Sequence, residues 1–380
     1  MAGPLNGVRV IELPAIGPVP FLGMLLTDLG ADVIRVDKLP EEPPDAGQAL
    51  AAGPLGRGRR SIALDLRKPG AADVVLRLAE TAEVLVEGFR PGVAERLGIG
   101  PVEAHARNPR LVYGRMTGWG QDGPLAQRAG HDITYLAVSG LLHGIGPAAG
   151  PPVPPVNYIG DFGGGAMFLG VGILAAVVHA RATGAGQVVD AAMTDGAAYL
   201  ATMTRTFLGA GGWRDERGAN LLDGGAPNYR CYACADDRYI AVGALEPRFW
   251  AELLRGLGLD PQTTPSPYEP AQWDACAKLL ATTFATRTRD EWAAVFEPLD
   301  ACVAPVLTLA EAPAHSHSAE RMSYVTVGGA TVAAPTPRFS ATPGAPGQLS
   351  LPGADTAAVL AELGYSSVDV EALRAAGAIG

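Results

Sequence analysis

Residues 8–37 read VRVIELPAIGPVPFLGMLLTDLGADVIRVD, and this stretch decides the fold. Its two ends, residues 8–13 and 31–37, are short runs rich in Val and Ile that are typical of buried strands. Between them, apolar residues recur at helical spacing over residues 18–29, and Gly30 is well placed to end that helix. The stretch therefore predicts a strand, a helix and a second strand.

The same alternation continues along the first half of the chain. Residues 61–66, 84–89 and 111–116 have strand-like patterns, and residues 71–80 have a helical one. Short strands that alternate with helical patterns of roughly 10–15 residues indicate a mostly parallel sheet flanked by helices, so we expect a Rossmann-like α/β domain. A dinucleotide-binding member of that class carries G-x-G-x-x-G in its first turn. Residues 13–20 read LPAIGPVP instead, which argues against NAD binding there.

The rest of the pattern predicts a second, smaller domain. We expect a large α/β domain over residues 1–208 and a Gly-rich linker over residues 209–225. A smaller α+β domain follows over residues 226–312, with a hairpin at 228–244 and three helices after it. Residues 313–380 are Pro-rich and then helical, and we expect this return segment to pack on the large domain.

The composition describes a well-packed globular protein. Of 380 residues, 48% are hydrophobic, and 29 basic against 39 acidic residues give a net charge of −10 without a basic tract, which argues against a nucleic-acid partner. The N-terminus has no signal-peptide pattern. The most apolar run, the 13 residues 166–178, is too short to span a bilayer. We therefore expect a cytoplasmic protein with no membrane span.

The four cysteines include a C-x-x-C pair, Cys231 and Cys234, which alone could suggest redox chemistry or half a zinc site. The pair lies in a strand-like segment, and neither a second C-x-x-C nor a spaced His pair completes a metal shell. We interpret all four cysteines as reduced and expect no metal site.

Three segments carry polar groups where a buried core would not place them. His131 and Asp132 fall in the first turn of a predicted helix, whose positive end disfavours an imidazolium and whose free N–H groups suit an oxyanion. Asp161 precedes the apolar helix in a glycine-rich run, and Glu246 follows a strand-like segment. A structural interpretation stays open, in which the acidic residues cap helices or turns and His131 is an ordinary surface residue.

Together these segments resemble the α-methylacyl-CoA racemases of the class III CoA-transferase superfamily. The resemblance runs in register from Leu5 to about Leu309 and weakens from there on. The motifs that carry it are Gly-His-Asp at 130–132, Gly-Asp-Phe-Gly-Gly-Gly at 160–165, Ala-Pro-Asn-Tyr at 226–229, Val-Gly-Ala-Leu-Glu-Pro at 242–247, and the segments 30–37, 88–92, 117–121 and 184–193. It implies an intertwined homodimer in which the large domain of one subunit and the small domain of the other share each active site.

The resemblance implies an enzyme that interconverts (2R)- and (2S)-2-methylacyl-CoA thioesters by moving the α-proton through an enolate. By similarity, His131 and Asp161 are the acid/base groups on opposite faces of the carbon. Glu246 orients and tunes His131, and Asp132 donates its backbone N–H to the enolate oxygen. The thioester carbonyl holds the enolate, so no metal or organic cofactor is required. Since each turnover uses one base and one acid, Asp161 must be protonated when His131 is neutral.

The resemblance also implies a pocket for the CoA part of the substrate in the large domain. CoA carries phosphates, for which guanidinium and ammonium groups are the suitable partners. The expected phosphate contacts are Lys38, Arg67, Arg90 and Arg96. The other expected pocket residues are Leu64, Asp65, Leu66, Gly88, Phe89, Gly130, Ile133, Thr134 and Tyr135.

Two other activities compete with the racemase. In a class III CoA-transferase, the residue matching Asp161 attacks the thioester and becomes an acyl anhydride. That branch usually carries Tyr at the position of His131 and has no evident use for a base there. The other alternative is a non-catalytic acyl-CoA-binding or scaffold protein on the same fold. The presence of His131, Asp161 and Glu246 together argues against it.

Overall fold

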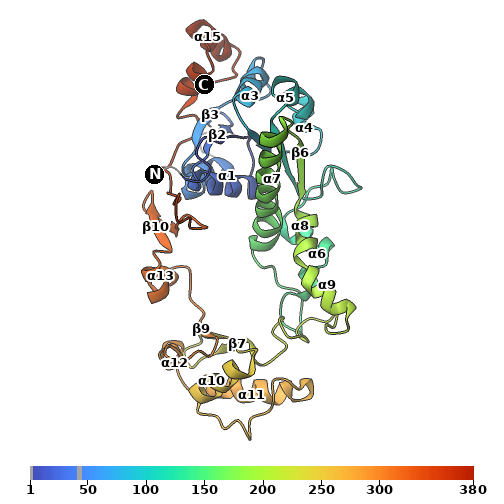
Figure 1. Cartoon of the computed structure of the whole chain (residues 1–380), viewed down its shortest axis with the longest axis vertical. Helices are drawn as coiled ribbons and strands as arrows, with labels where there is room; N and C mark the ends of the chain where they lie inside the picture. Colours follow the sequence, from blue (N-terminus) through green and yellow to red (C-terminus); the bar gives the residue numbers. More distant parts are fainter. Residues whose placement is uncertain (1–2, 41–44) are drawn as a thin grey trace. The chain divides into compact units, whose positions relative to one another are not determined.

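A computed structural model describes residues 3–40 and 45–380 of the chain (Figure 1). The chain forms two compact units: Met1–Ser139, Val156–Leu200 and Ser316–Gly380 make the larger, and Gly140–Pro155 and Ala201–His315 make the smaller. The segment 209–225, predicted as a linker, lies within the smaller unit. So does Gly140–Pro155, which the sequence places in the large domain.

The larger unit is built on a six-stranded sheet with the strand order β3-β2-β1-β4-β5-β6. Every neighbouring pair of strands is parallel, which confirms the predicted Rossmann-like α/β class. The sequence does not predict β6, a half-exposed edge strand. The strands are β1 (Arg9–Glu12), β2 (Asp32–Asp37), β3 (Arg60–Ala63), β4 (Val84–Glu87), β5 (Val112–Thr117) and β6 (Val188–Ala192).

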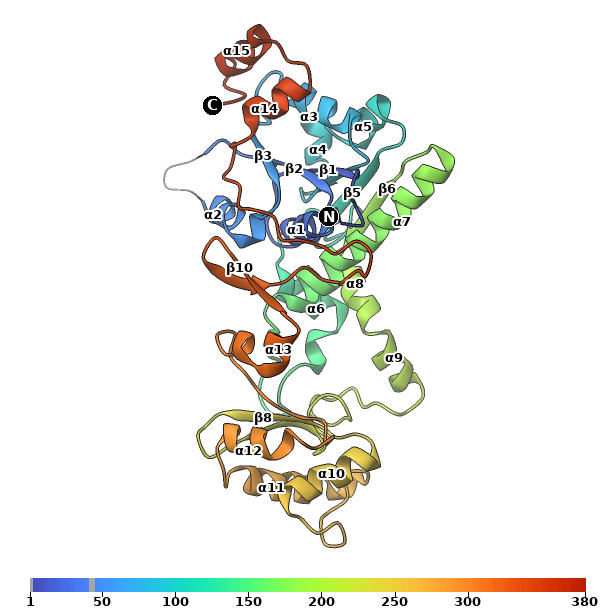
Figure 2. The same ribbon diagram turned by 60° about the vertical axis from the view of Figure 1, so that its left-hand side comes forward.

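Helices cover both faces of this sheet (Figure 2). Successive strand residues point to opposite faces, so Val10 packs with one set of helices and Ile11 with the other. Because both faces are buried, the strands are apolar runs without strict alternation. On the side of Val10 lie α1 (Pro18–Asp28) and α7 (Met167–Thr183); on the side of Ile11 lie α3 (Ala71–Glu80), α5 (Pro101–Arg107), α14 (Thr356–Glu362) and α15 (Ser367–Ala375).

Shorter elements complete the larger unit. An antiparallel hairpin of β10 (Tyr324–Val327) and β11 (Ala330–Ala333) belongs to the return segment. The helices and helical turns are α2 (Ala46–Ala52), η1 (Pro54–Gly56), α4 (Val93–Arg96), α6 (Asp132–Ser139), η3 (Tyr158–Ala166), α8 (Met193–Leu200) and α13 (Ser316–Glu320).

The apolar helix is longer than the sequence indicates. The π-helical segment η3 runs directly into α7, which gives a continuous helix, Tyr158–Thr183, of 26 residues. By length and composition alone this helix could cross a membrane, so the prediction based on a 13-residue run is wrong about its length. Its most apolar window is 44% buried within the fold, and Leu169 and Ile173 are among its fully covered residues.

The smaller unit has the α+β character and the hairpin that the sequence predicts. Its antiparallel sheet has the order β7-β8-β9, and one face packs on three helices through Ile240, Phe284 and Trp292. The segment 209–225 holds a well-formed turn, in which the buried Asn220 side chain donates to two backbone carbonyls. The elements are η2 (Leu142–Gly144), α9 (Thr202–Gly209), β7 (Tyr229–Ala233), β8 (Tyr239–Gly243), α10 (Pro247–Leu257), η4 (Pro270–Gln272), α11 (Trp273–Phe284), α12 (Arg289–Phe296), β9 (Val303–Pro305) and η5 (Ala312–Ala314).

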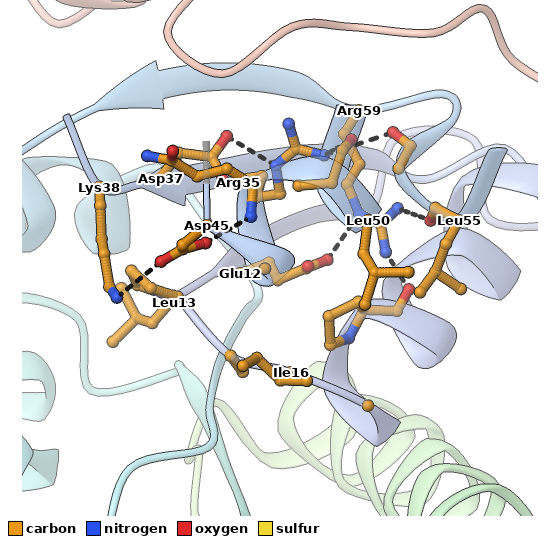
Figure 3. Close-up of a pocket in the computed structure, with 18 of the residues that line it drawn as sticks. Glu12, Leu13, Ile16, Arg35, Asp37, Lys38, Asp45, Leu50, Leu55 and Arg59 are labelled. Atoms are coloured by element: carbon orange, nitrogen blue, oxygen red, sulfur yellow. Dashed lines mark hydrogen bonds and ion pairs between the residues drawn. The ribbon is translucent and has the colours of Figure 1, made fainter. Parts of the chain in front are cut away.

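A buried ion pair fixes α1 to the carboxyl end of the sheet (Figure 3). Arg59 Nε donates to Glu12 Oε2 at 2.7 Å, and both side chains are almost fully buried. The same guanidinium donates to the carbonyl oxygens of Pro20 and Leu55. Helix α1 passes so close that a Cβ at Gly23 would lie 1.8 Å from Glu12 Oε2. The ion pair, the helix and the glycine therefore depend on one another.

Replacing Glu12 with Gln should lower the free energy of unfolding by about 3–5 kcal/mol, because Arg59 would stay buried without a counter-charge. Denaturant titration measures the change. Glu371→Gln, which breaks an exposed pair with Arg374, is the control and should change stability little. Equal effects of the two substitutions would show that the buried pair does not anchor α1.

Candidate active site

Helix α6 begins with His131 and Asp132 at the rim of a cavity. The His131 N–H donates to Thr134 Oγ1 at 3.0 Å, and this hydroxyl donates back to the His131 carbonyl at 2.7 Å. These two bonds fix the main chain of the first turn. The imidazole of His131 is exposed, whereas the Asp132 side chain is buried.

Asp132 connects α6 to the π-helical turn that carries Asp161. Its Oδ2 accepts the backbone N–H of Asp161 at 2.8 Å, and its Oδ1 is buried without a hydrogen bond to any described residue. A Cβ at Gly160 would lie 2.4 Å from that Oδ2, so only glycine fits there. The Gly-Asp pair at 160–161 is thus explained by the carboxylate that it contacts. Asp132 does not serve as an ordinary helix cap.

The Asp161 carboxyl is half-buried between charged and polar neighbours. Asn157 Nδ2 donates to Asp161 Oδ2 at 3.1 Å. Gly17, the N-cap of α1, is also close, since a Cβ there would lie 3.2 Å from the same oxygen. Burial is the main cause that raises the pKa of Asp161; the Asn157 hydrogen bond lowers it, the charge of Asp132 raises it, and His131 lowers it. The net effect favours the protonated carboxyl.

His131 and Asp161 line the same cavity, of about 490 Å³, although thirty positions separate them in the sequence. Its walls include Trp119 and Tyr135, whose rings pack edge to face at 4.8 Å. The predicted CoA residues that also line this cavity are Gly88, Phe89, Arg90, Gly130 and Tyr135. The structure therefore brings the two predicted acid/base groups together with part of the predicted CoA pocket.

A second cavity, of about 470 Å³, lies outside the carboxyl ends of β2, β3 and β4. The predicted CoA residues in its lining are Lys38, Leu64, Asp65, Leu66, Arg67 and Phe89. Phe89 lines both cavities, so the two adjoin. Lys38 Nζ lies 3.4 Å from Asp45, and the exposed Arg67 pairs with Asp65 at 2.8 Å. Both cations are held by pairs that solvent screens and that an anion could replace.

The location of these cavities follows from the strand order. The sheet runs outward in both directions from β1 and β4, and ligands of open parallel sheets bind outside the carboxyl ends at such a switch point. The loop after β1 supplies Ile16 and Gly17, and the loop after β4 supplies residues 88–90. Residues of both loops also line a smaller cavity of about 250 Å³, with Glu12 and Arg59 among its lining residues (Figure 3).

Five predicted site residues are not among those that line these three cavities. One is Asp132, whose buried carboxylate accepts the Asp161 N–H instead. Ile133 and Thr134 are exposed on α6, and Arg96 is exposed on α4. Glu246 belongs to the smaller unit, at the N-cap position of α10. Its side chain is exposed and makes no capping hydrogen bond, so the structural interpretation of Glu246 as a cap is not met.

Some residues of the site are not predicted from the sequence: Ile16, Gly17 and Trp119 line the cavity, and Asn157 donates a hydrogen bond to Asp161. Asn157 could have been found, because it stands four residues before Asp161, one helical turn away. The Pro-rich turn at 13–20 lacks the G-x-G-x-x-G motif of dinucleotide-binding proteins, but its sequence does not indicate that Ile16 and Gly17 line this cavity.

All four cysteines are free thiols. Within residues 3–40 and 45–380, no group of three or more His, Cys, Asp or Glu side chains is arranged to hold a metal ion.

The chain is similar to known proteins over nearly its whole length. A family model described as CoA-transferase family III matches residues 5–356. The chain is 43% identical over 369 residues to the α-methylacyl-CoA racemase of Mus musculus, covering 96% of this chain and 95% of that protein. It is 41% identical over 373 residues to the Homo sapiens racemase, covering 97% and 96%. The crystal structure of a CAIB/BAIF family protein from Brucella suis superposes with a TM-score of 0.82 at 25% identity, covering 96% of this chain and 100% of that one. The chain belongs to CoA-transferase family III.

Proposed function

We propose that the protein is a racemase that interconverts the two C2 epimers of 2-methylacyl-CoA thioesters. The observation that carries this proposal is the shared cavity of His131 and Asp161, which adjoins a second cavity with exposed cations. The mouse and human relatives, both racemases by name, align over nearly the whole chain and support the same activity.

Inversion at C2 needs a base on one face of the carbon and an acid on the other. His131, as a neutral imidazole, removes the α-proton, and the electron pair moves onto the thioester oxygen as an enolate. Asp161 then delivers its proton to the opposite face, and the reverse reaction exchanges the two roles. Burial raises the pKa of Asp161, which is the direction that this step requires.

The enolate oxygen needs a hydrogen-bond donor. The Asp132 N–H lies in the first turn of α6, where helical N–H groups lack partners within their own helix. Such a donor lowers the barrier by about 3 kcal/mol in comparable oxyanion sites. The chemistry is complete without a metal or an organic cofactor, because the thioester itself holds the charge.

The second cavity suits the CoA part of the substrate. Lys38 and Arg67 lie at its wall, and Arg90 lies in the loop that borders the catalytic cavity. We assign the phosphates to these cations and to the nearby exposed Arg96. The thioester would then reach the catalytic cavity past Phe89.

We further propose that the protein works as an intertwined homodimer, in which Glu246 of one subunit orients His131 of the other. An exposed apolar stripe on α7 supports association with a second copy: Met167, Val171, Leu174 and Val178 are 45%, 66%, 36% and 69% exposed. Their spacing places them on one face of the helix. Contiguous apolar surface of this kind marks protein contacts.

Incubation with either epimer in heavy water should incorporate deuterium at C2 and produce the other epimer, in the presence of EDTA. Mass spectrometry and chiral separation of the recovered acyl-CoA measure both outcomes. A transferase would exchange no α-proton and would move the acyl group to a free carboxylate. That result, or loss of turnover on chelation, would refute the proposed mechanism.

Single-base variants should separate the two faces. His131→Ala should slow inversion by at least about 100-fold, because one proton carrier is missing, while slow exchange with retention persists at the face served by Asp161. Asp161→Ala should show the complementary pattern. A transferase would tolerate the first change and lose every half-reaction with the second.

The two neighbours of Asp161 should shift its titration in opposite directions. Asp132→Asn removes a negative charge and should lower the pKa of Asp161, whereas Asn157→Ala removes a hydrogen bond to the ionised carboxylate and should raise it. For the epimer to which Asp161 donates a proton, kcat/KM falls as pH rises through this pKa. That limb should move by on the order of one pH unit, downward and upward respectively. Shifts of the same sign would contradict the assignment.

Heterodimers should reveal a shared active site. In a co-expressed, doubly tagged heterodimer of the His131→Ala and Glu246→Ala chains, one site has both residues intact if Glu246 acts across subunits. Such a heterodimer should have about half of wild-type activity, although each homodimer is impaired. Activity no higher than that of the parent homodimers would place Glu246 in its own subunit's site. A monomeric mass with full activity would refute the dimer itself.

A further inference from the structure

The outer edge of β3 is covered by the end of the chain. As the first strand in the order β3-β2-β1-β4-β5-β6, β3 has one side without a neighbouring strand. Its outward N–H groups nevertheless all have acceptors: Ser61 N–H donates to Asp355 Oδ2 at 2.8 Å, and Ala63 N–H donates to Thr356 Oγ1 at 3.1 Å. Two residues further on, Asp65 N–H donates to the Ala378 carbonyl at 3.0 Å. Every second residue along this edge, at positions 61, 63 and 65, thus donates its N–H to the same C-terminal segment, Gly353–Gly380.

The last of these bonds reaches the predicted CoA pocket. Asp65 lies in the loop Leu64–Arg67, which lines the second cavity opposite Lys38. The neighbouring Leu64 N–H donates inward to the Asp37 carbonyl at 2.8 Å. The loop is thus held on one side by β2 and on the other by the end of the chain.

The residue before Lys38 is connected to the same segment. Asp37 Oδ2 accepts from Ser61 Oγ at 2.6 Å, and Ser61 Oγ accepts the N–H of Gly353 at 2.7 Å. Both groups are buried, so these bonds are shielded from water. The C-terminal segment therefore reaches both edges of the cavity that holds the exposed cations.

The position of the Ala378 carbonyl is set by the end of α15. Gly377 N–H donates to Arg374 O and Ala378 N–H donates to Leu373 O, both at 2.9 Å, with Gly377 at a φ of 70°. This is a Schellman motif, which gives the chain a defined exit from the helix. Leu373 is buried against Gly70, where a Cβ would lie 2.6 Å from its Cδ2. The hydrogen bonds at the end of α15 and the packing of Leu373 on Gly70 therefore fix the position of the Ala378 carbonyl. The family model ends at residue 356, so it includes Gly353, Asp355 and Thr356 but stops before α15 and the Ala378 carbonyl.

We propose that the segment Gly353–Gly380 is a positioning element for CoA: it holds the Leu64–Arg67 loop and Asp37 in the geometry that receives the phosphate-bearing half of the substrate. This proposal rests on the proposed acyl-CoA function. It adds a segment that affects CoA binding without contacting the substrate. Its loss should weaken binding through the phosphates and leave proton transfer at C2 intact. We therefore expect a rise in KM for substrates that carry the nucleotide phosphates of CoA, and no rise for substrates that lack them.

Thr356→Val is the main test, since it keeps the side-chain shape and removes the acceptor of the Ala63 N–H. KM for a 2-methylacyl-CoA should rise about fivefold, the effect of one lost hydrogen bond, with kcat within about twofold of wild type. A chain ending at Gly377, which lacks the Ala378 carbonyl, should show a larger rise. With the matching acyl-pantetheine, which has no nucleotide phosphates, kcat/KM of both variants should equal that of wild type.

Gly364→Ala is the matched control. Gly364 ends α14 in the same left-handed conformation, with a φ of 79° and no atom within 4 Å of an added Cβ. The substitution should strain the C-terminal segment locally, at a position that makes no contact with β3. It should therefore lower the melting temperature and leave KM unchanged. If the truncated chain fails to fold, Thr356→Val decides.

Equal losses on acyl-CoA and acyl-pantetheine, or an unchanged KM for acyl-CoA in Thr356→Val, would overturn the positioning role. Failure of the proposed function is recognised separately, because wild-type protein would then neither racemise the acyl-CoA nor bind free CoA in a calorimeter.

Discussion

The hydrogen bond from the Asp161 N–H to Asp132 Oδ2 is the contact on which the active site depends. It joins the first turn of α6 (Asp132–Ser139) to the π-helical turn η3 (Tyr158–Ala166) that leads into α7. It fixes the main chain of Asp161 relative to the first turn of α6, directly after His131. Position 160 requires glycine, because a side chain there would displace the Asp132 carboxylate.

The same bond has an electrostatic consequence. A buried carboxylate with one oxygen unpartnered is costly, and such features persist in native proteins where function requires them. Here the negative charge of Asp132 stands close to Asp161 and disfavours a second ionised carboxyl. The π-helical geometry contributes as well, since a wider turn displaces Asp161 from the regular helical path, and such turns are frequent at functional sites. Asp132 thus holds the main chain of Asp161 and adds to the upward pKa shift that burial causes.

The sequence predicts the sheet well and the site only in part. Strands β1 to β5 are predictable because a parallel sheet with both faces buried requires continuous apolar runs, which stand out between helical patterns. Strand β6 is not, since it lies at the sheet edge and half of its residues face outward. The motifs around His131 and Asp161 indicate the chemistry through resemblance, but no local pattern shows that both side chains enter one cavity. Gly17 approaches Asp161 only in the folded chain and has no sequence signal, whereas the four-residue spacing of Asn157 and Asp161 is a weak one.

One carboxyl at the position of Asp161 can support either of the two reactions associated with this family, and its protonation state decides between them. As a nucleophile toward a thioester it must be ionised, because only the carboxylate carries the electron pair that forms the anhydride. As the acid of a racemase it must hold a proton while its partner is a neutral base. Each pH unit by which the environment raises the pKa of Asp161 favours the protonated form tenfold, or about 1.4 kcal/mol. In this chain burial is the main cause that raises this pKa and the charge of Asp132 adds to it, whereas the Asn157 hydrogen bond and His131 act in the opposite direction; the net shift is upward. The surroundings of Asp161 thus shift a carboxyl that both reactions share toward its protonated form, which is the direction that the proposed racemase requires.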